Sequence, residues 1–101
     1  MTEFEKKVLN IIKKIPAGRV TTYKHLAKAI GRPKACRAVG NALNKNPWAP
    51  KVPCHRVVKS DGKIGGYAHG VSQKMKLLKK EGIVINKGKI IDFNKILFNL
   101  R

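Results

Sequence analysis

The first residues carry a helical hydrophobic pattern, in which apolar side chains recur every three or four positions. The apolar positions are Phe4, Val8, Ile11, Ile12 and Ile15, and the opposite face carries Lys6, Lys7, Lys13 and Lys14. Thr2 followed by Glu5 has the spacing of a capping box, which marks a helix start. Pro16 and Gly18 mark the end, so the pattern predicts one amphipathic helix that begins beside Met1.

Two shorter helical patterns follow. Thr21 or Thr22 can cap the first, which runs through Tyr23, Leu26, Ala27 and Ile30 and ends at Gly31. Pro33 suits the first turn of the second, whose inner face is predicted to hold Ala35, Ala38, Val39, Ala42 and Leu43 and whose outer face holds Lys34, Arg37, Asn41 and Lys45. The pair predicts a helix-turn-helix that presents Arg37 to DNA. The alternative is an ordinary helical hairpin with a solvated charged face.

The second half of the chain mixes turns with short elements. Three prolines, Pro47, Pro50 and Pro53, make the passage before Cys54 rigid and non-regular. Residues 57–64 predict a hairpin with an Asp-Gly turn, and a helix is predicted from near Ser72 to Glu81 that buries Val71, Met75 and Leu78. Residues 83–91 predict a second hairpin, and a short helix is predicted from Phe93. The fold class is therefore mostly α with small β hairpins (α+β), with the helix-turn-helix in a winged-helix-like domain.

Length and charge narrow the class of protein. A chain of 101 residues with 43% hydrophobic residues predicts one domain over 1–101. Its formal net charge of +18 makes nucleic acid the leading partner, with an anionic membrane or a ribosomal surface behind it. No apolar run approaches the roughly 20 residues of a membrane span, so no membrane partner is expected. Two cysteines and no signal peptide favour a cytoplasmic protein. Richness in lysine and isoleucine favours a prokaryote, so we expect a monomer that is nucleoid-associated when bound to DNA.

The segment Pro53-Cys54-His55-Arg56 is the sharpest candidate for chemistry. A free thiol titrates near 8.5, so a nucleophilic cysteine needs a neighbouring base or cation. From this segment alone, a buried inert cysteine is an equal alternative. A metal site is a weaker one, because the possible ligands show no metal-binding spacing. Those ligands are Cys36, Cys54, His25, His55 and His69, and no cofactor is expected.

Six short motifs between about Gly18 and Gly82 resemble the O6-alkylguanine-DNA alkyltransferases. They are Thr21-Thr22-Tyr23, Arg37-Ala38-Val39-Gly40, Asn46-Pro47, Pro53-Cys54-His55-Arg56-Val57-Val58, Gly65-Gly66-Tyr67 and Leu77-Leu78-Lys79-Lys80-Glu81-Gly82. The resemblance implies a DNA repair protein that flips an O6-alkylguanine out of double-stranded DNA and takes the alkyl group irreversibly. It also implies that the domain preceding this one in most relatives is absent here.

The resemblance implies a role for each matching residue of the reactive centre. Cys54 is the nucleophile, and His55 is the base that takes the thiol proton through a bridging water. Glu81 orients the imidazole, Asn46 braces the preceding turn, and Tyr23 donates to the N3 atom of the flipped base. Each chain is then expected to react once, because a thioether is a poor leaving group.

The resemblance likewise implies a pocket and a DNA-binding face. Tyr67 lines the pocket, and the backbones of Cys54, Val57 and Ala68 contact the guanine edge. Leu43, Gly65 and Gly66 are further pocket candidates, although Ala68-His69 departs from the usual small polar and glycine pair. Arg37 fills the gap that the flipped nucleotide leaves in the duplex. The remaining candidates for DNA contact are Tyr23, Lys34, Asn41 and Thr22.

Two other functions compete with transfer. One is an alkyltransferase-like sensor that flips the lesion without accepting the group; sensors of this type lack the reactive cysteine, whereas Cys54 is present. The other is a basic helix-turn-helix regulator with an inert Cys54. That second function leaves Tyr23, Asn46 and Glu81 unexplained as a set.

Overall fold

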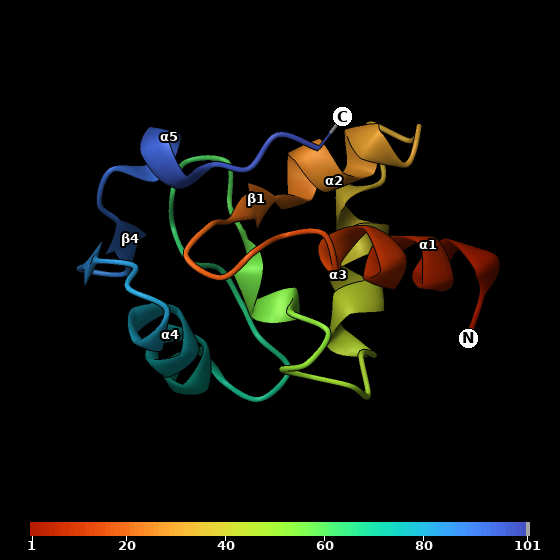
Figure 1. The fold of residues 1–101 in the computed structure, drawn as a ribbon. Helices are drawn as coiled ribbons and strands as arrows, with labels where there is room; N and C mark the ends of the chain where they lie inside the picture. Colours follow the sequence, from red (N-terminus) through yellow and green to blue (C-terminus); the bar gives the residue numbers. More distant parts are fainter. Residues whose placement is uncertain (101) are drawn as a thin grey trace.

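The computed structural model describes residues 1–100 as a mostly helical domain with short strands (Figure 1). Its order is α1 (Glu3–Ile12), β1 (Thr21–Thr22), α2 (Tyr23–Ala29), α3 (Cys36–Asn44), the 3₁₀ turn η1 (Cys54–Arg56), β2 (Val57–Val58), α4 (Val71–Lys80), β3 (Ile85–Asn86), β4 (Lys89–Ile90) and α5 (Phe93–Ile96). This confirms the predicted fold class. None of the helices in the described part of the chain is long and apolar enough to cross a membrane.

The predicted capping box begins α1. The Glu5 N–H donates to Thr2 Oγ1 at 3.1 Å, and the Thr2 N–H donates to Glu5 Oε1 at 2.8 Å. Val8, Leu9 and Ile12 of this helix are buried, and α1 packs on α3. The helix ends at Ile12, earlier than the pattern predicted, and a turn carries Ile15 into the core.

The two short helices α2 and α3 pack against each other as predicted, but α3 begins later than Pro33. The Ala35 N–H donates to the Arg32 carbonyl, so residues 32–35 form a turn and the helix begins at Cys36. The later start places Val39, Ala42 and Leu43 in the core. Ala38, predicted to face inward, is exposed beside Arg37 on the outer face.

The Val57–Val58 segment does not form the predicted hairpin. Strand β2 pairs with β1 in parallel, with Thr21 opposite Val57 and Thr22 opposite Val58. The predicted turn is present, because the Gly62 N–H donates to the Lys59 carbonyl at 3.0 Å and the Lys59 N–H to the Lys63 carbonyl at 2.9 Å. The segment after the turn bonds to residues 88–90 instead of pairing with β2. The parallel pair places the start of α2 beside the segment that carries Cys54.

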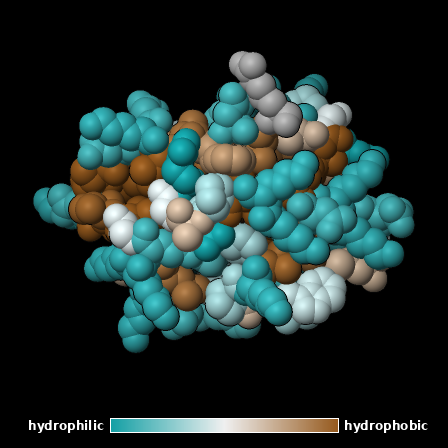
Figure 2. All heavy atoms as spheres, viewed as in Figure 1, coloured by the Kyte–Doolittle hydropathy of each residue, from teal (hydrophilic) through white to brown (hydrophobic). Residues whose placement is uncertain are grey.

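The C-terminal part packs around a second, smaller core, which includes Val20, Val58, Leu78 and Ile90. The hairpin of β3 and β4 and the short helix α5 are confirmed. In α4, Leu78 is buried as predicted, whereas Val71 is exposed at the first helical position and Lys74 is fully buried instead. Figure 2 shows hydrophilic side chains over most of one face, with an apolar area near this C-terminal hairpin.

Candidate active site

Cys54 lies at the start of η1 and is buried, with 4% of its surface exposed. Its N–H donates to the Val52 carbonyl at 2.9 Å, and the Arg56 N–H donates to the Pro53 carbonyl at 3.0 Å. The chain therefore turns at Cys54 rather than running extended. In an extended segment neighbouring side chains point to opposite faces, and at this turn that constraint on Cys54 and His55 does not apply.

A cavity of about 920 Å³ opens at Cys54. Its lining comes from α2, α3, η1 and the segment after Gly65, and comprises Tyr23, Cys36, Arg37, Gly40, Asn41, Leu43, Asn44, Cys54, Gly66, Tyr67 and Ala68. The predicted pocket residues Leu43, Gly66, Tyr67 and Ala68 are thus brought together. Two others do not line the cavity: Val57 is fully buried in β2, and Gly65 packs behind Tyr23.

Two phenols in the cavity wall are held in their neutral form. Burial raises the pKa of Tyr67 to about 12, and the nearby Cys54 sulfur adds to the rise. The pKa of Tyr23 is raised as well, first by burial and then by Cys54. Both hydroxyls therefore remain proton donors at neutral pH, on the same cavity as the thiol.

His55 is joined to Glu81 as the resemblance implied. Its Nε2 lies 2.9 Å from Glu81 Oε2. Burial is the largest influence on the imidazole and lowers the pKa of His55, so the ring is neutral at pH 7. A carboxylate only accepts, so Nε2 carries the proton and Nδ1 has a free lone pair. Nδ1 is buried and has no hydrogen-bond partner within the described chain.

Arg56 fixes the carboxylate that His55 uses. Its Nε and Nη2 donate to Glu81 at 3.0 and 2.7 Å, and its Nη1 donates to the Ile15 carbonyl at 2.7 Å. Burial alone would raise the pKa of Glu81, but the hydrogen bonds from Arg56 and His55 outweigh it and hold that pKa below its usual range. The sequence pointed to Arg56 as a cation beside the thiol; the structure directs it to Glu81.

Lys74 is a site residue that the sequence did not single out. It is fully buried, and its Nζ donates to the Val57 carbonyl at 2.7 Å and to the Gly66 carbonyl at 3.0 Å. The same nitrogen lies 5.9 Å from the centre of the Tyr23 ring. Burial lowers the pKa of Lys74 to about 8, although the Cys54 sulfur acts in the other direction. Lys74 thus ties strand β2 to the Gly66 segment of the cavity wall, close to the Tyr23 ring.

Asn46 braces the turn before Cys54, as expected. Its Nδ2 donates to the Val52 carbonyl at 2.8 Å, and its Oδ1 accepts from the Trp48 N–H at 2.9 Å. Because the Val52 carbonyl also accepts from the Cys54 N–H, one buried amide links the end of α3 to the reactive segment.

The predicted DNA-binding residues separate into two groups. Arg37 and Asn41 lie at the cavity on the exposed face of α3, and Lys34 is exposed just before that helix. Thr22 is a correction: it is fully buried, because its hydroxyl accepts from the His25 N–H and caps α2. Because Thr22 is 0% exposed, it cannot contact a DNA phosphate.

The described part of the chain offers no set of ligands for the metal site that the sequence left as a weaker alternative. Within residues 1–100, no three side chains of histidine, cysteine, aspartate or glutamate lie together as a metal site. Both cysteines are free thiols, and both line the cavity.

Comparison with known proteins agrees with the resemblance. Residues 3–83 match the family model described as "6-O-methylguanine DNA methyltransferase, DNA binding domain". A methylated-DNA-protein-cysteine methyltransferase of Methanosarcina acetivorans is 57% identical over 81 residues, which are 80% of this chain and 52% of that protein. The bifunctional transcriptional activator and DNA repair enzyme Ada of Escherichia coli is 48% identical over 79% of this chain and 23% of its own length. The chain thus spans about half the length of the first of these relatives.

Solved structures give the same result. OGT of Mycobacterium tuberculosis in complex with DNA has a TM-score of 0.78 and 43% identity, over 80% of this chain and 50% of that one. Atl1 of Schizosaccharomyces pombe, in complex with damaged DNA containing O6-carboxymethylguanine, has a TM-score of 0.86 and 30% identity, over 98% of this chain and 97% of that one. By its sequence, its fold and the residues gathered at its cavity, the chain belongs to the 6-O-methylguanine DNA methyltransferase family, whose DNA-binding domain it matches.

Proposed function

We propose that this chain removes the alkyl group from O6-alkylguanine in double-stranded DNA and accepts it on Cys54. One observation carries the proposal: Cys54 lines a cavity, and the next residue, His55, is a neutral imidazole whose Nε2–H is committed to Glu81 and whose Nδ1 lone pair is free. A base oriented by a carboxylate next to a thiol is the arrangement that activates a cysteine nucleophile.

The proposed step exchanges one bond to carbon for another. His55 Nδ1 takes the thiol proton, directly or through a water, and the Cys54 sulfur attacks the alkyl carbon. The sulfur–carbon bond forms as the bond from that carbon to O6 breaks, and its electron pair leaves with the guanine. The neutral Tyr23 hydroxyl supplies the hydrogen bond at the base N3 as negative charge develops there, and the guanine gains one proton for the one lost by the thiol.

The proposed DNA contact runs along α3. Arg37 is exposed at the cavity, and in this proposal it enters the duplex where the flipped nucleotide stood. Extrusion costs a few kcal/mol, and a cation that fills the gap offsets part of that cost. Lys34 and Asn41 lie on the same face and would contact the backbone.

A lesion sensor is the second candidate, favoured by one observation. Atl1 matches nearly the whole of both chains, and that structure holds DNA with O6-carboxymethylguanine. Against a sensor stands Cys54 itself, together with the hydrogen-bonded His55 and Glu81, which recognition alone does not require.

Intact mass after incubation with a duplex that contains O6-methylguanine separates the two candidates. Transfer predicts one added methyl group per chain, lost in Cys54→Ser and retained in Cys36→Ser, whose thiol lines the same cavity. A sensor predicts binding with unchanged mass. An unmodified chain after complete binding of the duplex therefore overturns the proposal.

A further inference from the structure

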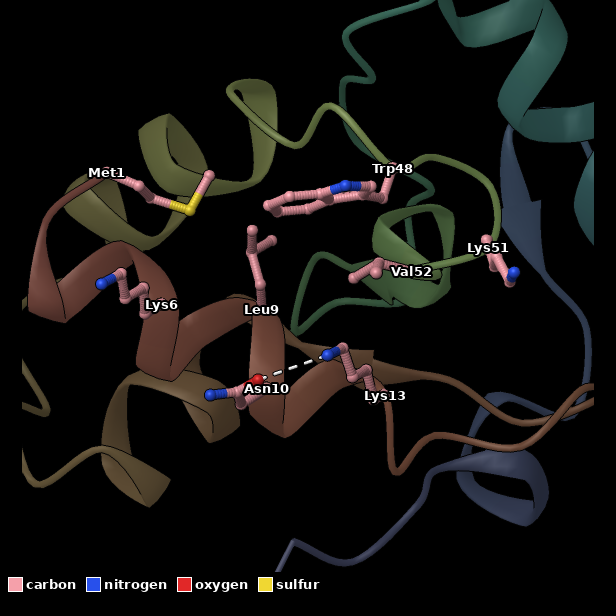
Figure 3. Close-up of a pocket in the computed structure, with 8 residues that line it drawn as sticks. All are labelled: Met1, Lys6, Leu9, Asn10, Lys13, Trp48, Lys51 and Val52. Carbon is pink, nitrogen blue, oxygen red and sulfur yellow. Dashed lines mark hydrogen bonds between the residues drawn. The ribbon is translucent and has the colours of Figure 1, made fainter.

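A second hollow, of about 600 Å³, shares no lining residue with the Cys54 cavity. It lies between α1 and the segment 48–52 (Figure 3), and its lining comprises Met1, Lys6, Leu9, Asn10, Lys13, Trp48, Lys51 and Val52. We call it the Trp48 groove. Because the two hollows are separate, an occupant of the groove leaves the Cys54 cavity open.

The floor of the Trp48 groove is apolar. Figure 3 shows the Trp48 indole lying across Leu9, with the Met1 thioether at one end and Val52 at the other. Trp48 is 55% exposed and Met1 is 53% exposed. A large aromatic side chain left open in a concave apolar surface is typical of a contact with another molecule.

The rim of the groove is positive. Lys6, Lys13 and Lys51 surround the floor (Figure 3). Lys13 donates only to the neutral Asn10 at 3.4 Å, and no carboxylate of residues 1–100 lies within ion-pair distance of Lys13 or Lys51. Lys6 has a single long contact of 3.9 Å with the exposed Glu3. The groove therefore complements an occupant that combines carboxylates with an apolar side chain.

Two other occupants fit less well. A second copy of this chain carries the same net charge of +18, so long-range repulsion opposes its approach. A single-stranded nucleic acid satisfies the lysines and can stack on Trp48. Its bases, however, would lay their polar edges against Leu9, Val52 and Met1, which offer no hydrogen-bond partner.

We propose that the Trp48 groove binds an acidic, amphipathic segment of a partner protein. An apolar side chain of the segment packs on Trp48, Leu9 and Val52, and its carboxylates pair with Lys13 and Lys51. The wall of the groove is the loop that Asn46 braces, since the Trp48 N–H and the Val52 carbonyl are both bonded to that amide. The partner thus contacts the segment that leads into Cys54 without entering the cavity.

Trp48 is the sole tryptophan, so its fluorescence reports directly on the groove. The probe is a tryptophan-free helical peptide with leucines on one face and glutamates on the other, and its control is a scrambled peptide of identical composition. The amphipathic peptide is expected to shift the emission to shorter wavelength and to bind about tenfold more tightly than the scrambled one. Equal affinity for the two peptides means attraction by net charge alone and overturns the proposal.

Charge variants locate the site without altering the floor. Lys13→Glu combined with Lys51→Glu is expected to weaken the amphipathic peptide about tenfold or more. The matched control, Lys76→Glu combined with Lys95→Glu at exposed positions of α4 and α5, changes the net charge by the same amount and is expected to leave affinity nearly unchanged. Equal weakening in both, or displacement of the peptide by a thymine oligonucleotide that binds the groove more tightly, contradicts the proposal.

Discussion

His55, Glu81 and Arg56 form a neutral set at the scale of single residues. The Arg56 guanidinium cancels the Glu81 carboxylate, and burial keeps the His55 imidazole uncharged. Burying one unpaired charge costs several kcal/mol, whereas a paired and fully hydrogen-bonded set costs far less. The set therefore keeps the Nδ1 lone pair of His55 free without leaving an uncompensated charge in the core.

Gly65 allows Tyr23 to approach the cavity floor. A Cβ at Gly65 would lie 3.2 Å from the Tyr23 hydroxyl oxygen, and the residue has a φ of +72°. Gly65→Ala is expected to lower the free energy of unfolding by about 1–2 kcal/mol. The matched change Gly40→Ala, at a helical position with open space, is expected to raise it by about 0.5–1 kcal/mol. Urea unfolding measures both, and shifts of the same sign would contradict the close approach.

Lys74 makes stability depend on pH. Its pKa is about 8 in the folded chain, against 10.5 for an ordinary lysine. Below about pH 8 the residue is protonated in both states and adds no slope. From there toward about pH 10 the unfolded chain holds more protons, so the free energy of unfolding contributed by Lys74 rises with pH.

Lys74→Met is expected to remove this rise in the free energy of unfolding, measured with urea between about pH 8 and pH 10. Lys76→Met, at an exposed position of the same helix, is expected to keep it. An unchanged slope in Lys74→Met would show that another group causes it.

Among the helices and strands, a helix start that depends on neighbouring residues could be predicted, whereas a strand pairing between distant segments could not. The capping box of Thr2 and Glu5 lies within one turn, so the start of α1 could be read from the sequence. The partner of Val57–Val58 is Thr21–Thr22, far away in the chain, and a nearby Asp-Gly turn suggested a hairpin instead. An exposed turn at residues 32–35 likewise moved the start of α3 past Pro33.

The candidate site likewise combines residues that the sequence could predict with residues that only the fold reveals. The cavity residues Gly66 and Tyr67 follow from one of the motifs that carry the family resemblance, Gly65-Gly66-Tyr67. Lys74 could not be predicted, because a lysine in a helical pattern is expected to be solvated and only the fold shows the two carbonyls that hold it. The burial of Thr22 could not be predicted either. A helix cap and a DNA contact both use the threonine hydroxyl, and the sequence does not decide between them.

The loop between α3 and η1 depends on one side chain. Asn46→Ala removes both hydrogen bonds of a buried amide, and is expected to lower the free energy of unfolding by about 1–3 kcal/mol and to slow the reaction with free O6-benzylguanine. Asn44→Ala, at the exposed end of α3, is the control for stability and is expected to change it by less than about 0.5 kcal/mol. Equal unfolding free energies for the two variants would remove the bracing role.

At the scale of the whole molecule, the net charge attracts DNA in general, whereas in the proposed reaction the residues at the Cys54 cavity act on the flipped nucleotide. A net charge of +18 attracts any polyanion, but Arg37 is the one charged residue in the lining of the Cys54 cavity within the described chain. Arg37→Ala is expected to slow transfer from duplex DNA about tenfold or more while leaving the reaction with free O6-benzylguanine nearly unchanged, because the free base needs no flipping. Single-turnover rates with the two substrates measure this. Equal slowing of both reactions would exclude the role in extrusion.

In the proposed reaction the sulfur of Cys54, and no other atom of the chain, receives the alkyl group. Peptide mapping by mass spectrometry, after reaction with excess O6-methylguanine duplex, tests it most directly. The result predicted is one S-methylcysteine at position 54, in an amount equal to the lesions repaired, with Cys36 unmodified. A methyl group on Cys36, or repaired lesions that outnumber the protein chains, would contradict the account.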